Sequence, residues 1–307
     1  MATIERSRDQ FRHILSSRDL VGRSRHCDLR IEKNFVSNEH AVLQWNGERW
    51  DLRDLGSRNG TFLDGERIEP GVLVPLREGV SFEFGATEES WRLLDVSAPT
   101  PLARAEDGRA EVLGDDGLLA LPDPENPEVT VFLRHGAIWV AERGDTEEAV
   151  TDRSLVVAGD RRWMLRLPET LVSTEGVSLK PPSAEEKLAL RFRVSRDEEH
   201  VELTAHEGER ALDLGARAHH HVLLVLARQR LRDQSDESLP ETSRGWLYQD
   251  DVARMLAIDE PRVNVGIYRA RKQLAKAGAL APVAVVERRA GTRQLRIGTG
   301  RIEIVSL

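Results

Sequence analysis

The chain has 307 residues, of which 40% are hydrophobic and 31% are charged. This is the composition of soluble globular domains, and the length predicts two or three of them. No run of about 18 apolar residues occurs and the N-terminus lacks an apolar signal segment, so we expect no membrane span and a cytoplasmic location. The single cysteine, Cys27, excludes an internal disulfide and a cysteine-rich metal site.

The net charge of −8 is distributed unevenly along the chain. Residues 246–307 contain 11 lysine and arginine residues against 6 acidic residues, so the rest of the chain is strongly acidic. This asymmetry is typical of a protein whose one end meets a polyanion, although a chance fluctuation of surface charge would look the same.

Residues 10–96 have the pattern of short β-strands separated by polar turns. The segments HAVLQW, RWDLRDL and VSFEFG alternate apolar and polar residues, as half-buried strands do. An Asn-Gly or Asp-Gly pair begins at each of positions 46, 59 and 64, where turns are expected. Many short strands at regular spacing predict a β-sandwich.

Three ordered segments of this region carry a more specific signal. They are Gly-Arg-Ser at 22–24, Ser-Asn-Glu-His at 37–40 and Leu-Gly-Ser-Arg-Asn-Gly-Thr-Phe at 55–62. In identity, order and spacing the set resembles the forkhead-associated (FHA) domain, over about residues 1–96. The resemblance implies a β-sandwich that binds a phosphothreonine-containing protein or a Ser/Thr kinase.

The residue types in these segments suit a phosphate ligand. Phosphothreonine carries nearly two negative charges, and an arginine can donate a pair of charge-assisted hydrogen bonds to it. By resemblance, Arg23 and Ser37 are the phosphate ligands and Asn59 holds the peptide backbone, while Asn38 and Arg58 contact phosphate or flanking residues. Three neighbours are expected to be structural: Gly22, His40 and Gly60.

Each of these residues also has an ordinary interpretation. Arg23 taken alone would be a solvated surface arginine, and Asn59 would be a common hairpin residue. Cys27 lies in strand-like sequence, where a small buried thiol is the expected role.

Residues 97–108 are predicted to be a linker, and residues 109–172 return to a strand pattern. Hairpins are expected to turn near His135-Gly136 and at Gly159-Asp160. This strand pattern is similar to the end of the first domain and predicts an FHA-like β domain. The domain is expected to be degenerate, because Gly-Arg, Ser-x-x-His and Asn-Gly are missing from it. Such a domain would be a spacer, a dimerisation surface or a cap on the third domain. Its tryptophans, Trp139 and Trp163, are expected in the core, with an exposed aromatic interface as the alternative.

Residues 174–186 are predicted to be a second linker, and residues 187–307 have a different pattern. Two strands precede helices expected over 217–232, 248–258 and 261–277, and the chain closes with a basic hairpin. This order resembles a winged-helix domain of the kind found in the output domains of bacterial response regulators, which implies an α+β fold that binds DNA. An acidic loop over 233–245 departs from that family's usual form.

The helix predicted over 261–277 has one apolar face, formed by Val263, Ile267, Ala270 and Leu274. Arg262, Gly266, Arg269, Gln273 and Lys276 are expected on the other face, with Arg269 as the best candidate for a base contact. A solvated cationic face is the alternative. The full set of expected DNA-binding residues is Arg262, Asn264, Tyr268, Arg269, Arg271, Lys272 and Lys276 on the helix, and Arg288, Arg289 and Arg293 in the wing.

No catalytic motif is present, so we expect a binding protein without catalytic residues, cofactor or metal. The run His219-His220-His221 is expected to be exposed and polar, because adjacent helical residues point about 100° apart and cannot all ligate one metal.

The sequence therefore predicts a phosphothreonine-dependent bacterial transcription regulator, in which the FHA domain docks a phosphorylated partner and the winged helix binds double-stranded DNA. The alternative is a phosphopeptide-binding signalling adaptor whose winged helix contacts protein. Either form could assemble as a homo-oligomer.

Overall fold

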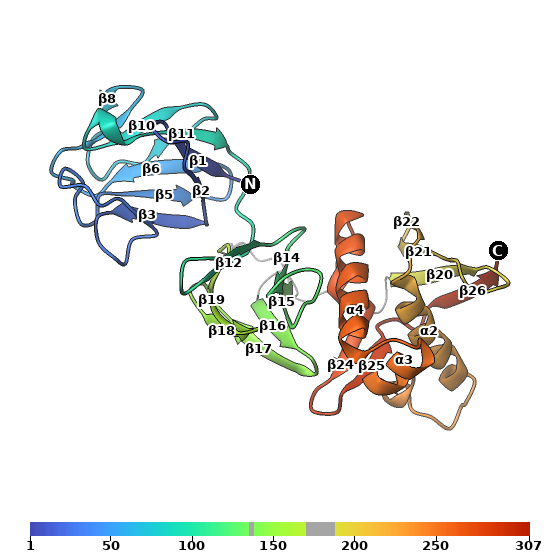
Figure 1. Cartoon of the computed structure of the whole chain (residues 1–307). Coiled ribbons are helices and arrows are strands. Elements are labelled where there is room, and N and C mark those ends of the chain that lie inside the picture. The colour runs from blue at the N-terminus through green and yellow to red at the C-terminus, as the bar shows by residue number, and fades with distance from the viewer. Residues whose placement is uncertain (135–137, 170–187) are drawn as a thin grey trace. The chain divides into compact units, whose positions relative to one another are not determined.

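The computed structural model describes residues 1–134, 138–169 and 188–307 (Figure 1). These residues form two compact units. The first is Met1–Leu102 with the short stretch that begins at Arg166, and the second combines Ala103–Leu165 with residues 188–307. The predicted turn near His135-Gly136 and the predicted linker 174–186 lie outside the described residues.

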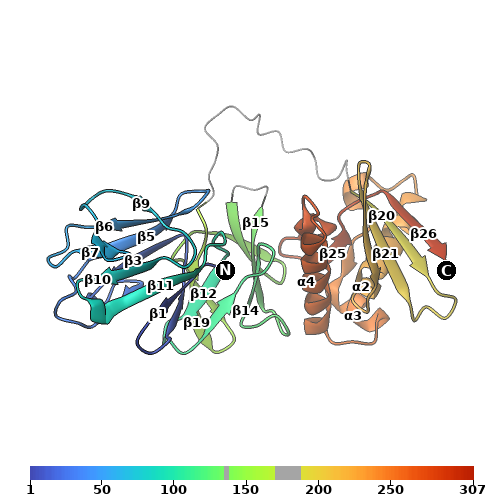
Figure 2. The same cartoon turned by 90° about the horizontal axis from the view of Figure 1, so that it is seen from above.

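The first unit contains two β-sheets that face each other, as predicted for a β-sandwich (Figure 2). The six-stranded sheet has the order β2-β1-β11-β10-β7-β8, and the five-stranded sheet has the order β4-β3-β5-β6-β9. The strands are β1 (Thr3–Arg6), β2 (Arg12–Ile14), β3 (Arg18–Gly22), β4 (Leu29–Arg30), β5 (Ala41–Trp45), β6 (Trp50–Asp54), β7 (Thr61–Leu63), β8 (Glu66–Arg67), β9 (Val74–Pro75), β10 (Ser81–Phe84) and β11 (Ser90–Asp95).

The core between these sheets consists of the inward residues of each alternating strand. Leu43 and Leu52 from one sheet and Phe82 and Trp91 from the other are all fully buried. Each side chain of this size contributes about 1.5–3 kcal/mol when it leaves water. The core therefore fixes strand register, and the register fixes where the connecting loops emerge.

The first unit contains a buried cluster of charged side chains around Asp19. The carboxylate of Asp19 is fully buried and lies 3.0 Å from Nε2 of His13. Arg166, at the end of β19 (Arg161–Arg166), places Nη2 3.5 Å from Asp19 and also pairs with Asp28. Burial alone would raise the pKa of Asp19, but its hydrogen bond to His13 and the nearby charge of Arg166 lower the pKa below its ordinary value.

We expect Arg166→Leu to lower the free energy of unfolding of the first unit by about 3 kcal/mol, because it leaves Asp19 buried without this cation. Urea unfolding followed by tryptophan fluorescence measures the change. Arg161→Leu is the matched control: this arginine of the same strand is 43% exposed, and its loss should cost less than about 1 kcal/mol. Equal losses in the two variants would contradict the role assigned to Arg166.

Residues 102–166, most of which belong to the second unit, form eight strands arranged as two four-stranded sheets with the orders β13-β12-β19-β18 and β14-β15-β16-β17. The predicted linker 97–108 is partly wrong, because Leu102–Ala105 forms β12 and pairs beside β19. Trp139 and Trp163 are buried as predicted, and the hairpin at Gly159-Asp160 is present. The remaining strands are β13 (Glu111–Leu113), β14 (Leu118–Leu121), β15 (Val129–Arg134), β16 (Ile138–Arg143), β17 (Thr146–Val150) and β18 (Leu155–Ala158). The relation of this β segment to an FHA domain stays a prediction.

Residues 188–307 combine two sheets with helices. The larger sheet has four strands in the order β22-β21-β20-β26. The smaller sheet has three strands in the order β23-β25-β24. The three predicted helices are present as α2 (His220–Gln234), α3 (Gln249–Met255) and α4 (Glu260–Lys276). The remaining elements are β20 (Leu188–Val194), β21 (Val201–Glu207), β22 (Arg210–Ala216), β23 (Leu247–Tyr248), β24 (Val286–Arg289), β25 (Gln294–Ile297) and β26 (Ile302–Ser306).

The expectation of a single closing hairpin is partly wrong. Strands β24 and β25 form the hairpin, but β26 leaves it and pairs in parallel with β20. Alternating apolar residues explain the difference, because Ile302 and Ile304 pack against the core of this part. No helix among the described residues has the length and apolar character needed to cross a membrane.

Helix α4 begins and ends as its sequence predicts. The Asp259 carboxylate accepts a hydrogen bond from the backbone N–H of Arg262 at 3.0 Å, and Pro261 occupies the first turn. The predicted apolar face is confirmed, because Val263, Ile267, Ala270 and Leu274 are all buried in the core. Gly278, with a φ of 81°, follows the helix end.

Candidate functional site

The predicted phosphopeptide site lies on three loops at one end of the first unit, after β3, before β5 and between β6 and β7. The first two loops approach closely because Gly22 has no side chain: a Cβ there would lie 2.3 Å from the carbonyl oxygen of Asn38. The backbone N–H of Arg23 donates to the carbonyl of Ser37 at 2.9 Å, and that of Ser24 donates to Asn38 at 3.1 Å. These bonds place Arg23 beside Ser37, as predicted.

His40 joins the second loop to the third. Its side chain is fully buried, and its Nδ1 accepts the backbone N–H of Ser37 at 3.1 Å. Its Nε2 lies 3.1 Å from the carbonyl oxygen of Gly60, so Nε2 carries the proton in a neutral ring. Burial lowers the pKa of His40 below its ordinary value. The structural role expected for His40 follows from these contacts.

The third loop is fastened to the second by two more hydrogen bonds. The backbone N–H of Arg58 donates to the hydroxyl oxygen of Ser37 at 3.0 Å, and Nδ2 of Asn59 donates to the carbonyl of Phe35 at 2.8 Å. Within the described part of the chain, Oδ1 of Asn59 makes no hydrogen bond, so it can accept one from a peptide N–H. The Ser37 hydroxyl proton can still be donated to a phosphate.

Asp54 shapes the third loop and was not predicted from the sequence. Its carboxylate accepts backbone N–H groups of Gly56 and Ser57 at 2.8 Å, and hydroxyls of Ser57 and Thr61 at 2.6 Å. Burial alone would raise the pKa of Asp54, but the hydrogen bonds from Ser57 and Thr61 lower it. The sequence signal was an aspartate followed by Gly and Ser at two and three positions, which is typical of a side chain that caps a turn.

The ligand-facing side chains are left accessible by this scaffold. Arg23, Asn38, Arg58 and Asn59 are exposed, and Ser37 is half-buried. Nη2 of Arg23 lies 3.3 Å from Oδ1 of Asn38, a long contact that leaves the guanidinium able to turn towards a phosphate. The five predicted ligand residues are thus brought together by three loops whose backbones are hydrogen-bonded to one another.

Comparison with known proteins agrees with this geometry. Residues 20–85 match the family model described as FHA domain, so the N-terminal region carries an FHA domain. "FHA domain-containing protein FhaB" of Mycobacterium tuberculosis is 37% identical over 68 residues, which cover 22% of this chain and 43% of that protein. "Smad nuclear-interacting protein 1" of Mus musculus is 37% identical over 103 residues, covering 29% of this chain and 27% of that protein. The chain therefore spans less than half the length of these curated relatives.

Among solved structures, "Mycobacterium tuberculosis EmbR in complex with low affinity phosphopeptide" is 22% identical, with a TM-score of 0.29. The match covers 32% of this chain and 25% of EmbR.

The residues predicted to bind DNA are only partly exposed. Arg262, Arg269, Lys276 and Arg293 are exposed, and Asn264 and Lys272 are half-buried. Tyr268 and Arg271 are buried, and the side chain of Arg288 is 5% exposed. Arg289 is half-buried, with its guanidinium 4.5 Å from the ring centre of Trp246.

The expected cationic face of α4 needs a correction. Gly266 is buried against Val222 of α2, and Gln273 is half-buried, with its Oε1 2.8 Å from Nε2 of His219 and 2.9 Å from Nε2 of His220. Both positions lie three residues from members of the apolar face, so they belong to the side that packs on the rest of the domain.

The prediction that His219, His220 and His221 are exposed is also wrong, because His219 and His221 are half-buried and His220 is buried. His220 is fully buried, with Nδ1 3.1 Å from the carbonyl oxygen of Val201. Burial lowers the pKa of His219 to about 4. A neutral His219 can donate from Nε2 to Gln273, whereas a neutral His220 has one N–H and can donate to either Val201 or Gln273, not to both. No cluster of three metal-ligating side chains occurs in the described ranges.

We expect His40→Ala to lower the free energy of unfolding of the first unit by about 2–4 kcal/mol, because two buried hydrogen bonds are lost and a cavity is left. The pH dependence adds a second readout. Because the pKa of His40 is lowered in the folded state, its contribution is present above about pH 6.5 and is lost as the pH falls below that value.

Urea unfolding at about pH 7 and about pH 5 tests both points. The exposed residue His26 provides the matched control, since its substitution by alanine should change neither stability nor pH dependence appreciably. A His40→Ala variant with the wild-type pH dependence would contradict the neutral, buried role.

Proposed function

We propose that this chain is a phosphothreonine-dependent regulator of transcription, in which the FHA domain docks a phosphorylated protein and residues 188–307 form a winged helix that binds duplex DNA. Phosphothreonine binding by the FHA domain is supported by one observation: hydrogen bonds hold three loops together around the exposed side chain of Arg23. A dianionic phosphate there would meet a guanidinium, a hydroxyl and a side-chain amide at once. The partner is a phosphothreonine-containing protein or a Ser/Thr kinase.

The DNA half is supported by the order and charge of the C-terminal elements. Three strands, β20, β21 and β22, precede α2, and α3 and α4 are followed by the β24–β25 hairpin. This is the order expected of a winged helix, with α4 as the helix that reads the major groove and the hairpin as the wing. Exposed Arg262, Arg269 and Lys276 follow one another along α4.

A second candidate function is a phosphopeptide-binding adaptor whose helical part contacts protein. The observation that favours it is the burial of Arg271, which pairs with a carboxylate instead of facing solvent. Neither candidate requires catalysis, a cofactor or a metal.

We expect Arg23→Ala to weaken the binding of a degenerate phosphothreonine peptide library by at least about tenfold, because a charge-assisted hydrogen bond contributes about 1.5–3 kcal/mol. Fluorescence anisotropy measures the affinity, with the dephosphorylated library as a further comparison. Arg12→Ala is the control, since Arg12 is an exposed arginine of β2 that is not part of the three loops. Equal affinities for the two variants would contradict the site.

We expect the full chain to bind duplex genomic fragments at low salt, with an affinity that falls steeply as salt rises because counterions are released from DNA. The double variant Arg262→Glu, Lys276→Glu should lose this binding. The matched control is Arg191→Glu, Arg193→Glu on β20, which changes the net charge equally on another surface. An equal loss in both variants would show only a net-charge effect, and absence of any DNA binding would favour the adaptor.

A further inference from the structure

Several of the side chains proposed to read DNA contact the β segment of the same unit. Tyr268 of α4 is 4% exposed and joins a buried cluster with Leu118, Ala120, Phe132 and Val140, which lie on β14, β15 and β16. A tyrosine in such a cluster is shielded from water and from any solvent-borne ligand. The apolar contact therefore covers the middle of the helix.

A single carboxylate engages two of the predicted DNA-binding arginines. Glu142 of β16 accepts from Nη1 and Nη2 of Arg271 at 2.8 and 3.1 Å, and its Oε1 lies 3.0 Å from Nε of Arg288. The three side chains are 5%, 3% and 5% exposed. Burial alone would raise the pKa of Glu142, but the two arginines lower it, so the group is an anion. The paired oxygens offer the arginines the same forked geometry that a phosphate offers.

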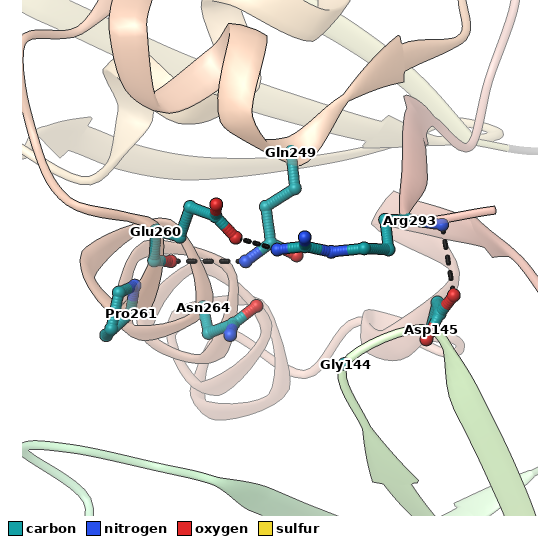
Figure 3. Close-up of a pocket in the computed structure, with 7 residues that line it drawn as sticks. All are labelled: Gly144, Asp145, Gln249, Glu260, Pro261, Asn264 and Arg293. Carbon is teal, nitrogen blue, oxygen red and sulfur yellow. Dashed lines mark hydrogen bonds and ion pairs between the residues drawn. The ribbon is translucent and has the colours of Figure 1, made fainter. Parts of the chain in front are cut away.

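Further acidic groups of the β segment surround this pair. Asp115 lies 3.0 Å from Nζ of Lys272, and Glu125 pairs with Arg269. In the turn between β16 and β17, Asp145 accepts the backbone N–H of Arg293 at 3.0 Å, beside Gly144 (Figure 3). Acidic side chains thus meet both α4 and the wing tip, where the proposed function places DNA phosphates.

The contact between the β segment and α4 is expected to be weak enough to open. Exposed pairs such as Lys272 with Asp115 contribute about 0–1 kcal/mol each. In the buried pair of Glu142 with Arg271, the cost of desolvation offsets most of the attraction. The apolar cluster is small, so the contact resembles the modest interfaces between domains that separate and rejoin.

We propose that the β12–β19 segment caps the proposed DNA-reading surface, which is α4 with the β24–β25 wing, and that this segment and DNA compete for the same cationic side chains. This inference rests on the proposed function, because it names how that DNA-binding surface is regulated. Four carboxylates, Asp115, Glu125, Glu142 and Asp145, occupy the places of phosphates in the capped form. Duplex DNA requires that form to open.

The test reverses the exposed carboxylates Asp115 and Glu125 and the half-buried Asp145 of the cap, and leaves the DNA-reading surface unchanged. The triple variant Asp115→Lys, Glu125→Lys, Asp145→Lys keeps Glu142 and every predicted DNA-binding residue. Its matched control is Glu106→Lys, Glu148→Lys, Asp160→Lys, which makes the same charge change at exposed residues of the same β segment that do not pair with α4 or the wing. Affinity of the full chain for duplex genomic fragments is measured for both variants and for wild type over a range of salt.

We expect the cap variant to bind at least about tenfold more tightly than the control variant, because removing a competing closed state raises the apparent affinity. Equal affinities of the two variants would overturn the cap and leave DNA binding intact. Absence of binding by every form would overturn the proposed DNA function and the cap with it. Hydrogen exchange gives an independent readout: adding DNA to wild type should speed exchange in β14 and β16, and unchanged or slower exchange there would overturn the cap.

Discussion

The proposed phosphopeptide site depends on one neutral imidazole. His40 accepts the N–H of Ser37 on one side and donates to the carbonyl of Gly60 on the other, so a single buried ring sets the spacing of two loops. The third contact, from the N–H of Arg58 to the Ser37 hydroxyl, holds only if that spacing is correct. Arg23 is then supported by backbone bonds and keeps its guanidinium exposed. Hydrogen bonds hold the loop backbones that would position a peptide, whereas the Arg23 guanidinium that would meet a phosphate stays exposed.

In the second unit, two arginines are buried against a carboxylate instead of being exposed to solvent. Around the FHA site the cations are exposed, whereas Arg271 and Arg288 are withdrawn from solvent by one carboxylate. A buried pair of this kind adds little net stability compared with apolar packing, but it specifies which surfaces meet. In the proposed account, this pair makes the β12–β19 segment one of two partners of α4, and duplex DNA is the other. The proposed competition between them depends on that choice.

The limits of sequence reasoning follow from the range of each interaction. The three loop motifs are local, so their resemblance to the FHA domain could be recognised in the sequence, and the structure brings the residues named from it onto three neighbouring loops. Helix boundaries and the apolar face of α4 followed from spacing and caps in the same way. The partner of Arg271 is 129 positions away in a segment without a motif, and no local pattern announces it. His220 was misplaced for a similar reason, because its ring nitrogens contact Val201 and Gln273, which lie 19 and 53 positions away.

The measurement that tests the account most directly is a nuclear magnetic resonance titration of the isotope-labelled full chain with a phosphothreonine peptide library. The account predicts the largest shifts at the backbone amides of Arg23, Ser37, Asn38, Arg58 and Asn59, with none when the dephosphorylated library is added. Shifts that are absent, that appear with both libraries, or that fall on another surface would contradict it.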